Sequence, residues 1–206
     1  MRLFVGIALA DAVVRELKAT VAGLRSRGPA DRQARESPVA GLRWTEPDSW
    51  HITLQFLGNA TPEQYACLLA QLGDVRSLPV PVELGSLGCF DRTGVLFADI
   101  TVTPALAALA DGVMAATSGC GFVAETRPFH PHITLARMKG QGRGAELRSL
   151  TSGMRNQPRF LPFTAREFLL YESHLNAEGA RYEVRGRFPL QQMGKHGRDA
   201  PHTDIL

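Results

Sequence analysis

The tetrapeptide His-Ile-Thr-Leu occurs twice in this chain of 206 residues, at positions 51–54 and 132–135. The first copy lies within Trp-His-Ile-Thr-Leu-Gln-Phe-Leu-Gly at 50–58, and the second within Pro-Phe-His-Pro-His-Ile-Thr-Leu-Ala-Arg at 128–137. Both stretches are typical of strands, in which successive side chains point to opposite faces. This alternation predicts that each copy presents its histidine and threonine on one face and buries its isoleucine and leucine on the other.

The residues that follow each copy extend the same alternation. In the first strand it puts Gln55 on the histidine face and Phe56 in the core. In the second strand it puts Arg137 on the core side with Leu135, so we expect the strand to end, twist or bulge before this arginine. If the two copies lie side by side, one face holds two histidines and two threonines.

Such a face has a clear chemical use. Two imidazoles on opposite sides of a phosphodiester can serve as acid and base near pH 7, and threonine hydroxyls can donate to the phosphoryl oxygens. This chemistry needs no metal. The alternative is that His51 and His132 are ordinary packed or surface residues and that Thr53 and Thr134 are merely good strand formers. The duplication within apolar strands favours the functional interpretation.

The two stretches resemble the paired HxTx motifs of the two-histidine (2H) phosphoesterases, and among these the RNA 2′,3′-cyclic phosphodiesterases of bacteria and archaea, historically called 2′-5′ RNA ligases. Other segments are also similar to that group: Arg-Leu-Phe-Val-Gly-Ile-Ala-Leu at 2–9, Leu-Gly-Cys-Phe at 87–90 and Leu-Leu-Tyr-Glu-Ser at 169–173. The resemblance therefore covers nearly the whole chain.

The resemblance implies an α+β fold of two pseudo-symmetric lobes, with antiparallel sheets around a central cleft and helices on the outside. It implies metal-independent hydrolysis, without a cofactor, of a terminal 2′,3′-cyclic phosphate on RNA to a 2′-phosphate. His51 would match the proton donor to the leaving 3′ oxygen, and His132 the base that activates water. Thr53 and Thr134 would hold the phosphate, and Arg137 would contact the nucleotide.

Four further residues are candidates near such a site. Phe90 and Phe129 could stack on bases, although core packing explains each of them equally well. His130 and His132 resemble an HxH metal pair, but no third ligand follows at a recognisable spacing, so we expect no metal. His130 would then support His132 or line the cleft, and we expect His174 to be exposed at the end of a strand.

The composition fits a globular protein, with 44% apolar and 21% charged residues. The apolar run at 3–10 is too short to cross a membrane, and the N-terminal stretch is too short for a secretory signal. The net charge of +3 hides a pattern, because residues 1–43 carry +4, residues 44–136 carry −6 and residues 137–187 carry +5. Most of the basic residues are arginines, which bind phosphate well, so the ends of the chain could flank an anionic ligand.

Hydrophobic periodicity predicts alternating strands and helices. Strands are expected at 3–9, 50–57, 80–87, 95–102, 133–138, 160–171 and 182–188, and helices at 11–25, after Thr61, after Thr103 and at 143–152. The sequence Thr61-Pro62-Glu63-Gln64 predicts a capping box with proline at the first helical position. We expect residues 1–190 to form one bilobal domain, with a mobile Arg-rich loop at 26–41 and a disordered tail at 191–206.

The three cysteines, Cys67, Cys89 and Cys120, are odd in number and form no CxxC motif, so we expect ordinary thiols in a reduced, cytoplasmic protein. The expected partners are RNA ends or nucleotides with a 2′,3′-cyclic phosphate, and we expect a monomer that binds no membrane. Three alternatives stay open: a reversible 2′-5′ RNA ligase, a phosphodiesterase acting on a small cyclic nucleotide or a 2′-5′ oligonucleotide, and a non-catalytic RNA-binding module.

Overall fold

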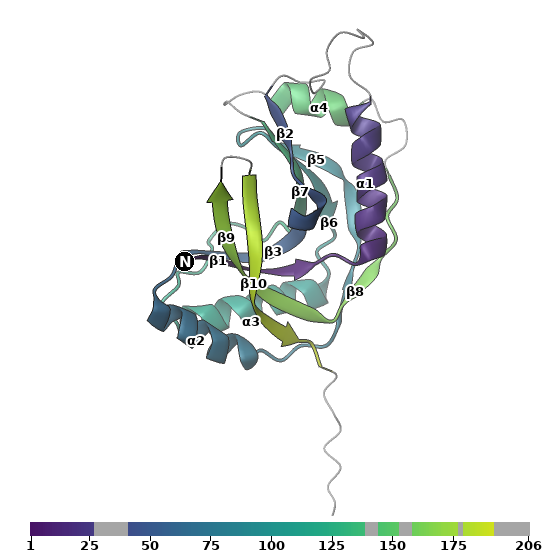
Figure 1. The fold of residues 1–206 in the computed structure, drawn as a ribbon. Helices are drawn as coiled ribbons and strands as arrows, with labels where there is room; N and C mark the ends of the chain where they lie inside the picture. The colour runs from purple at the N-terminus through teal and green to yellow at the C-terminus, as the bar shows by residue number, and fades with distance from the viewer. Residues whose placement is uncertain (27–40, 139–143, 153–157, 177–178, 192–206) are drawn as a thin grey trace, which may run out of the picture.

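The computed structural model describes residues 1–26, 41–138, 144–152, 158–176 and 179–191 (Figure 1). The predicted Arg-rich loop and the predicted tail therefore lie almost wholly outside the described residues. In chain order, the elements are β1 (Arg2–Ala8), α1 (Asp11–Arg25), β2 (Leu42–Trp44), η1 (Pro47–Ser49), β3 (His51–Asn59), α2 (Pro62–Gly73), β4 (Val80–Val82), β5 (Leu84–Phe90), β6 (Val95–Ile100), α3 (Pro104–Ser118), β7 (His132–Met138), α4 (Gly144–Ser152), β8 (Phe163–Ala165), β9 (Glu167–Asn176) and β10 (Gly179–Pro189).

The strands form two four-stranded antiparallel sheets and a small two-stranded one. The first sheet has the order β10-β9-β1-β3, the second β2-β7-β6-β5, and β4 pairs with β8. The strands that carry the two His-Ile-Thr-Leu copies, β3 and β7, lie against each other where the two large sheets meet. The predicted α+β class is confirmed, and the cleft stays a prediction.

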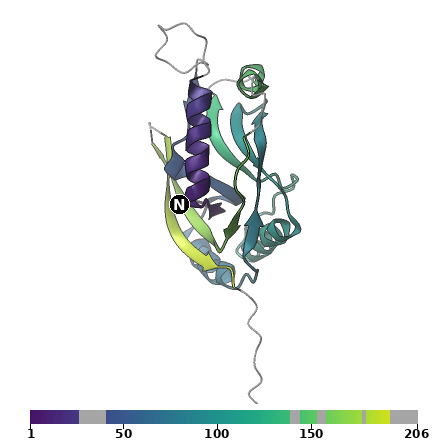
Figure 2. The same ribbon diagram turned by 90° about the vertical axis from the view of Figure 1, so that its right-hand side faces the viewer.

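The helices cover the outsides of the two sheets (Figures 1 and 2). α2 and α3 pack together below the first sheet, with α3 against β3, while α4 packs on β5 and β6. α1 follows β1 of the first sheet, yet it lies beside the second sheet, where the Arg25 guanidinium is 5.2 Å from the ring centre of Trp44. α1 and α3 thus each cross from the sheet that precedes them to the other sheet.

The predicted capping box at the start of α2 is confirmed. The Thr61 hydroxyl accepts a hydrogen bond from the Gln64 backbone N–H at 3.2 Å, and the Gln64 side chain accepts one from the Thr61 N–H at 3.1 Å. Pro62 takes the first helical position, where no backbone donor is needed. Thr103 caps α3 in the same way, through the Leu106 N–H at 3.2 Å. Hydrogen bonds between residues three positions apart therefore define the start of both helices.

Two of the predicted strands are wrong as single elements. The segment predicted at 80–87 contains β4 and the start of β5, and the one predicted at 160–171 contains β8 and the start of β9. β4 and β8 pair only with each other, far apart in the sequence. β2 was not predicted, because a three-residue strand carries too little periodicity to be recognised.

A bulge in β3 overturns the predicted faces of Gln55 and Phe56. Gly6 of β1 lies opposite Thr53 while Val5 lies opposite Gln55, so Leu54 is the extra residue. The alternation reverses beyond it. The side chain of Gln55 is only 4% exposed, and its amide oxygen accepts a hydrogen bond from a buried threonine hydroxyl of α3 at 2.8 Å. Phe56, predicted to be in the core, is 65% exposed.

The prediction that all three cysteines are free thiols is wrong. Cys67 of α2 and Cys120, just after α3, form a disulfide across 53 residues. The odd count concealed this pair, because only the packing of α2 against α3 brings the two sulfurs together. Cys89 remains free and half-buried. In the described part of the chain, none of the helices is both long enough and apolar enough to span a bilayer.

Candidate active site

His51 stands at the first position of β3, with its ring fixed by the backbone. Its Nδ1 is 2.7 Å from the carbonyl oxygen of Ser49, so Nδ1–H donates to that oxygen and Nε2 is left to exchange protons. The pKa of His51 is lowered to about 4, chiefly by burial, and the nearby charges of His132 and Arg137 act in the same direction. The first sheet therefore presents a neutral imidazole whose Nε2 has no hydrogen-bond partner among the described residues.

His132 repeats this local geometry at the start of β7. Its Nδ1 is 2.9 Å from the carbonyl oxygen of His130, again two residues earlier in the chain. Burial also lowers the pKa of His132, while the carboxylate of Asp99 acts in the opposite direction. The charge of His132 acts on the pKa of His51, and Arg137 lowers the pKa of both histidines, so the two imidazoles share one electrostatic site.

Aromatic rings enclose His51 on the face of the first sheet that carries it, which we call the histidine face. The ring of Phe4 lies 4.6 Å from His51, that of Tyr182 lies 4.9 Å away edge-on, and that of Tyr171 lies 5.8 Å away. Gly6 permits this packing, because a Cβ there would meet a backbone oxygen of β3 at 2.7 Å. This cluster is separate from the main core, and burial within it raises the pKa of Tyr171 to about 12.

A second group of rings surrounds His132. Phe90 lies 5.0 Å from it, edge-on, and Phe97 lies 5.4 Å away. Gly88 makes room for the Phe97 ring, since a Cβ there would lie 2.6 Å from it. The structure thus brings the predicted residue Phe90 to the histidine. Phe129 instead packs, half-buried, against the main core.

His130 supports His132, one of the two roles that the sequence suggested. Its carbonyl oxygen orients the His132 ring, and its own Nε2 lies 3.0 Å from Asp99 Oδ1. The structure does not group His130 and His132 as metal ligands. Among the described residues, the group with ligand atoms close enough for a metal is Glu172, His174 and Glu183.

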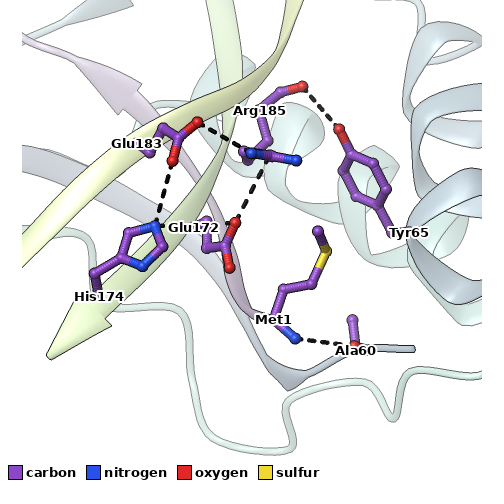
Figure 3. A network of polar contacts seen from close by, with 7 residues as sticks. All are labelled: Met1, Ala60, Tyr65, Glu172, His174, Glu183 and Arg185. Atoms are coloured by element: carbon purple, nitrogen blue, oxygen red, sulfur yellow. Dashed lines mark hydrogen bonds and ion pairs between the residues drawn. The ribbon is translucent and has the colours of Figure 1, made fainter. Parts of the chain in front are cut away.

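That second group lies on the opposite face of the first sheet, and Figure 3 shows its contacts. The Arg185 guanidinium reaches between the two carboxylates, with Nη1 3.0 Å from Glu183 and Nε 3.7 Å from Glu172. His174 is half-exposed, as predicted, and lies 3.4 Å from Glu183. Because one guanidinium pairs with both carboxylates, the group forms an ion-pair network on the sheet surface.

The two threonines and Arg137 complete the histidine site. Thr53 and Thr134 are half-buried, and neither hydroxyl has a hydrogen-bond partner among the described residues. A bulge at Leu135, which the sequence allowed for, exposes Arg137 and turns it to the histidine side. Arg137 has no ion pair with a described acid, and its charge lowers the pKa of both histidines.

Sequence reasoning missed five aromatic residues at this site: Phe4, Phe56, Phe97, Tyr171 and Tyr182. One signal could have found Phe56. It stands five positions after the first histidine, just as Arg137 stands five positions after the second, and the same bulge exposes both side chains. The tyrosines carried no local signal, because β9 and β10 join the histidine face only through sheet pairing.

In the described part of the chain, two imidazoles with free Nε2 atoms, two unpartnered hydroxyls and one unpaired guanidinium form a site suited to a phosphate group and to proton transfer. An α+β fold of antiparallel sheets with this pair of histidine motifs is typical of a class of phosphoesterases. The chain matches the model of the 2′-5′ RNA ligase superfamily over residues 13–177, and it belongs to that family.

Curated relatives carry the name RNA 2′,3′-cyclic phosphodiesterase. The protein from Bacillus subtilis is 29% identical over 175 residues, which are 79% of this chain and 88% of that protein. The one from Escherichia coli K12 is 29% identical over 158 residues, covering 75% and 83%. The Geobacillus stearothermophilus protein is 33% identical over 156 residues, which are 71% of this chain and 47% of that longer protein.

Solved structures agree with this assignment of the fold. Escherichia coli LigT in its apo form superposes with a TM-score of 0.73 at 27% identity, covering 93% of this chain and 98% of LigT. A protein of Thermus thermophilus superposes with a TM-score of 0.66 at 26% identity, covering 94% and 100%. LigT has also been solved in complex with 3′-AMP.

Proposed function

We propose that this chain is an RNA 2′,3′-cyclic phosphodiesterase that converts a terminal cyclic phosphate to a 2′-phosphate without a metal or cofactor. One observation carries the proposal. Each sheet presents a histidine whose Nδ1 is bound to a backbone oxygen two residues earlier, beside a threonine hydroxyl with no described partner. The names of the curated relatives support the choice of substrate.

The reaction is an in-line displacement at phosphorus. Nε2 of His132 accepts a proton from water as the water oxygen bonds to phosphorus. The bond from phosphorus to the 3′ oxygen breaks, and protonated Nε2 of His51 donates its proton to that oxygen. The Thr53 and Thr134 hydroxyls donate to the non-bridging oxygens. Solvent then returns both imidazoles to their starting protonation states, so that one water molecule is consumed.

The site controls when His51 becomes an acid. With a pKa of about 4, this histidine is neutral at pH 7 before substrate binds. A phosphodiester beside it adds a negative charge within a few ångströms, which favours the imidazolium form. Arg137, unpaired among the described residues, attracts the same anion. Substrate binding therefore favours uptake of a proton from solvent by His51, which can then act as the acid.

Other parts of the proposal concern the substrate and its surroundings. Phe90, beside His132, offers a ring on which a base can stack, and Phe129 is a weaker candidate because it packs against the core. The partners are RNA ends, the domain spans residues 1–190, and the protein acts as a monomer in the cytoplasm. A disulfide is unusual in that compartment, so Cys67 and Cys120 would have to escape cellular reductants there.

The test is a chromatographic assay on 2′,3′-cyclic mononucleotides and on oligoribonucleotides with a cyclic end. The wild type should yield 2′-phosphates, with or without EDTA. His51→Asn and His132→Asn should each lose at least a hundredfold in kcat, because each removes a proton-transfer group. His174→Asn is the matched control, since the strand register puts His174 on the face of the sheet opposite to Phe4 and Tyr171.

Four outcomes would overturn the proposal. A wild-type rate in either histidine variant would refute the mechanism, and strong inhibition by EDTA would indicate a metal enzyme. Joined products from a cyclic end and a 5′-hydroxyl end would indicate a ligase. RNA binding without turnover, unaffected by loss of both histidines, would indicate a binding module.

A further inference from the structure

Tyr182 of β10 occupies an unusual position beside the histidine pair. Its ring lies edge-on to His51 at 4.9 Å and to Phe4 at 5.0 Å. Its hydroxyl forms no hydrogen bond with another described residue. A half-buried phenol that lies beside His51 and has no partner among the described residues is free to donate to a ligand.

The charges of two arginines on different sheets act on this phenol. Arg137 comes from β7 of the second sheet and Arg2 from β1 of the first. Burial raises the pKa of Tyr182, and the charges of Arg137 and Arg2 both act against that increase. The phenol therefore lies within the electrostatic reach of both guanidiniums.

The register of β1 places Arg2 on the histidine face. Side chains two positions apart share a face, so Arg2 follows Phe4, whose ring contacts both His51 and Tyr182. Arg2 is exposed, and it has no ion pair with any described acid. A line of donors thus runs from the histidines past Tyr182 to Arg2.

We infer that Arg2 and Tyr182 form a second phosphate subsite, which binds the phosphate on the 5′ side of the terminal nucleotide. The cyclic phosphate occupies the histidine pair and Arg137, and the next phosphate of the chain reaches Tyr182 and Arg2. The preferred substrate is then an RNA end, or a nucleotide with a 5′-phosphate, rather than a bare cyclic nucleoside phosphate. This inference rests on the proposed function.

The test compares adenosine 2′,3′-cyclic phosphate with its 5′-phosphorylated form. In the wild type the 5′-phosphate should raise kcat/KM roughly tenfold, mainly through KM, as expected for one charge-assisted contact. In Arg2→Gln the ratio of kcat/KM with and without the 5′-phosphate should fall close to one, and Arg2→Lys should restore part of it. Tyr182→Phe should also reduce this ratio. Arg181→Gln, which removes the neighbouring exposed arginine on the other face of β10, should keep the wild-type ratio.

A binding measurement separates failure of this inference from failure of the proposed function. Calorimetry with adenosine 2′-monophosphate and adenosine 2′,5′-bisphosphate needs no turnover, and the bisphosphate should bind roughly tenfold more tightly only when Arg2 is present. Equal affinities in the wild type, or an undiminished bisphosphate advantage in Arg2→Gln, would overturn the subsite. Hydrolysis of the cyclic phosphate could still proceed in either case.

Discussion

At the scale of single residues, His51 shows how burial can prepare an imidazole for the proposed proton transfer. The Phe4, Tyr171 and Tyr182 rings exclude water from its ring, and this desolvation holds its pKa at about 4. An imidazole that is kept neutral in the free protein can respond strongly to an arriving phosphate. The same burial also makes the folded state sensitive to acid.

We expect the free energy of unfolding to fall as the pH drops from 6.5 to 4. In this window the unfolded chain protonates His51 while the folded chain does not, so the unfolded state binds more protons and gains stability. A pKa difference of 2 to 3 units corresponds to a loss of about 3 kcal/mol from this group. Urea unfolding at several pH values measures it, and His51→Asn should flatten the slope. An equal slope in this variant would contradict the expectation.

The sequence predicted the two histidines and threonines, because short repeated motifs in apolar strands are visible without a structure. It could not place Phe56, since strict alternation assigns this residue to the core. The bulge at Leu54 depends on the pairing of β3 with β1, which no local pattern records. The bulge before Arg137 was anticipated only because an arginine on a core face is energetically costly.

At the scale of elements, the close approach of β1 and β3 depends on Gly6. We expect Gly6→Ala to destabilise the fold by about 1–3 kcal/mol, since its Cβ would lie 2.7 Å from a backbone oxygen and the strands would have to separate. Activity should fall as well, because His51 stands on β3. Gly23→Ala in α1 is the control, as nothing lies within 4 Å of a Cβ there. Denaturant unfolding compares the two, and equal stabilities would contradict the steric argument.

The disulfide joins α2 to the end of α3 beneath the first sheet. Its removal should lower the free energy of unfolding by up to about 4 kcal/mol, because the 53-residue loop regains freedom in the unfolded chain. Cys67→Ser, measured against Cys89→Ser as the control, tests this by thermal unfolding. The rate of cyclic phosphate hydrolysis by Cys67→Ser at 25 °C should equal that of the wild type, since Cys67 and Cys120 lie outside the histidine site. An unchanged melting temperature in Cys67→Ser would show that the bond adds no stability.

Helix starts were more predictable than strand partners. The capping residues Thr61 and Thr103 act within a few positions, so the sequence shows them directly. The pairing of β4 with β8 and the contact between Cys67 and Cys120 arise only when distant segments pack. Long-range pairing is therefore what the sequence alone left undetermined.

At the scale of the whole molecule, each of the two large sheets contributes one histidine to the proposed site. We expect the double variant with His51→Asn and His132→Asn to be only slightly slower than either single variant, because acid and base act in one transition state. Single-turnover rates on a cyclic mononucleotide measure this. If the fold-loss in rate of the double variant equalled the product of the two single losses, the two histidines would work independently.

The exchange of helices between the sheets has one further consequence. α1 follows a strand of the first sheet but covers the second, and α3 follows a strand of the second but packs on β3 of the first. If one sheet and the helix that follows it unfolded alone, the apolar face of the other sheet that this helix covers would be exposed to water. The molecule should therefore melt as one cooperative unit, in an all-or-none transition that leaves no half-folded form with one intact lobe.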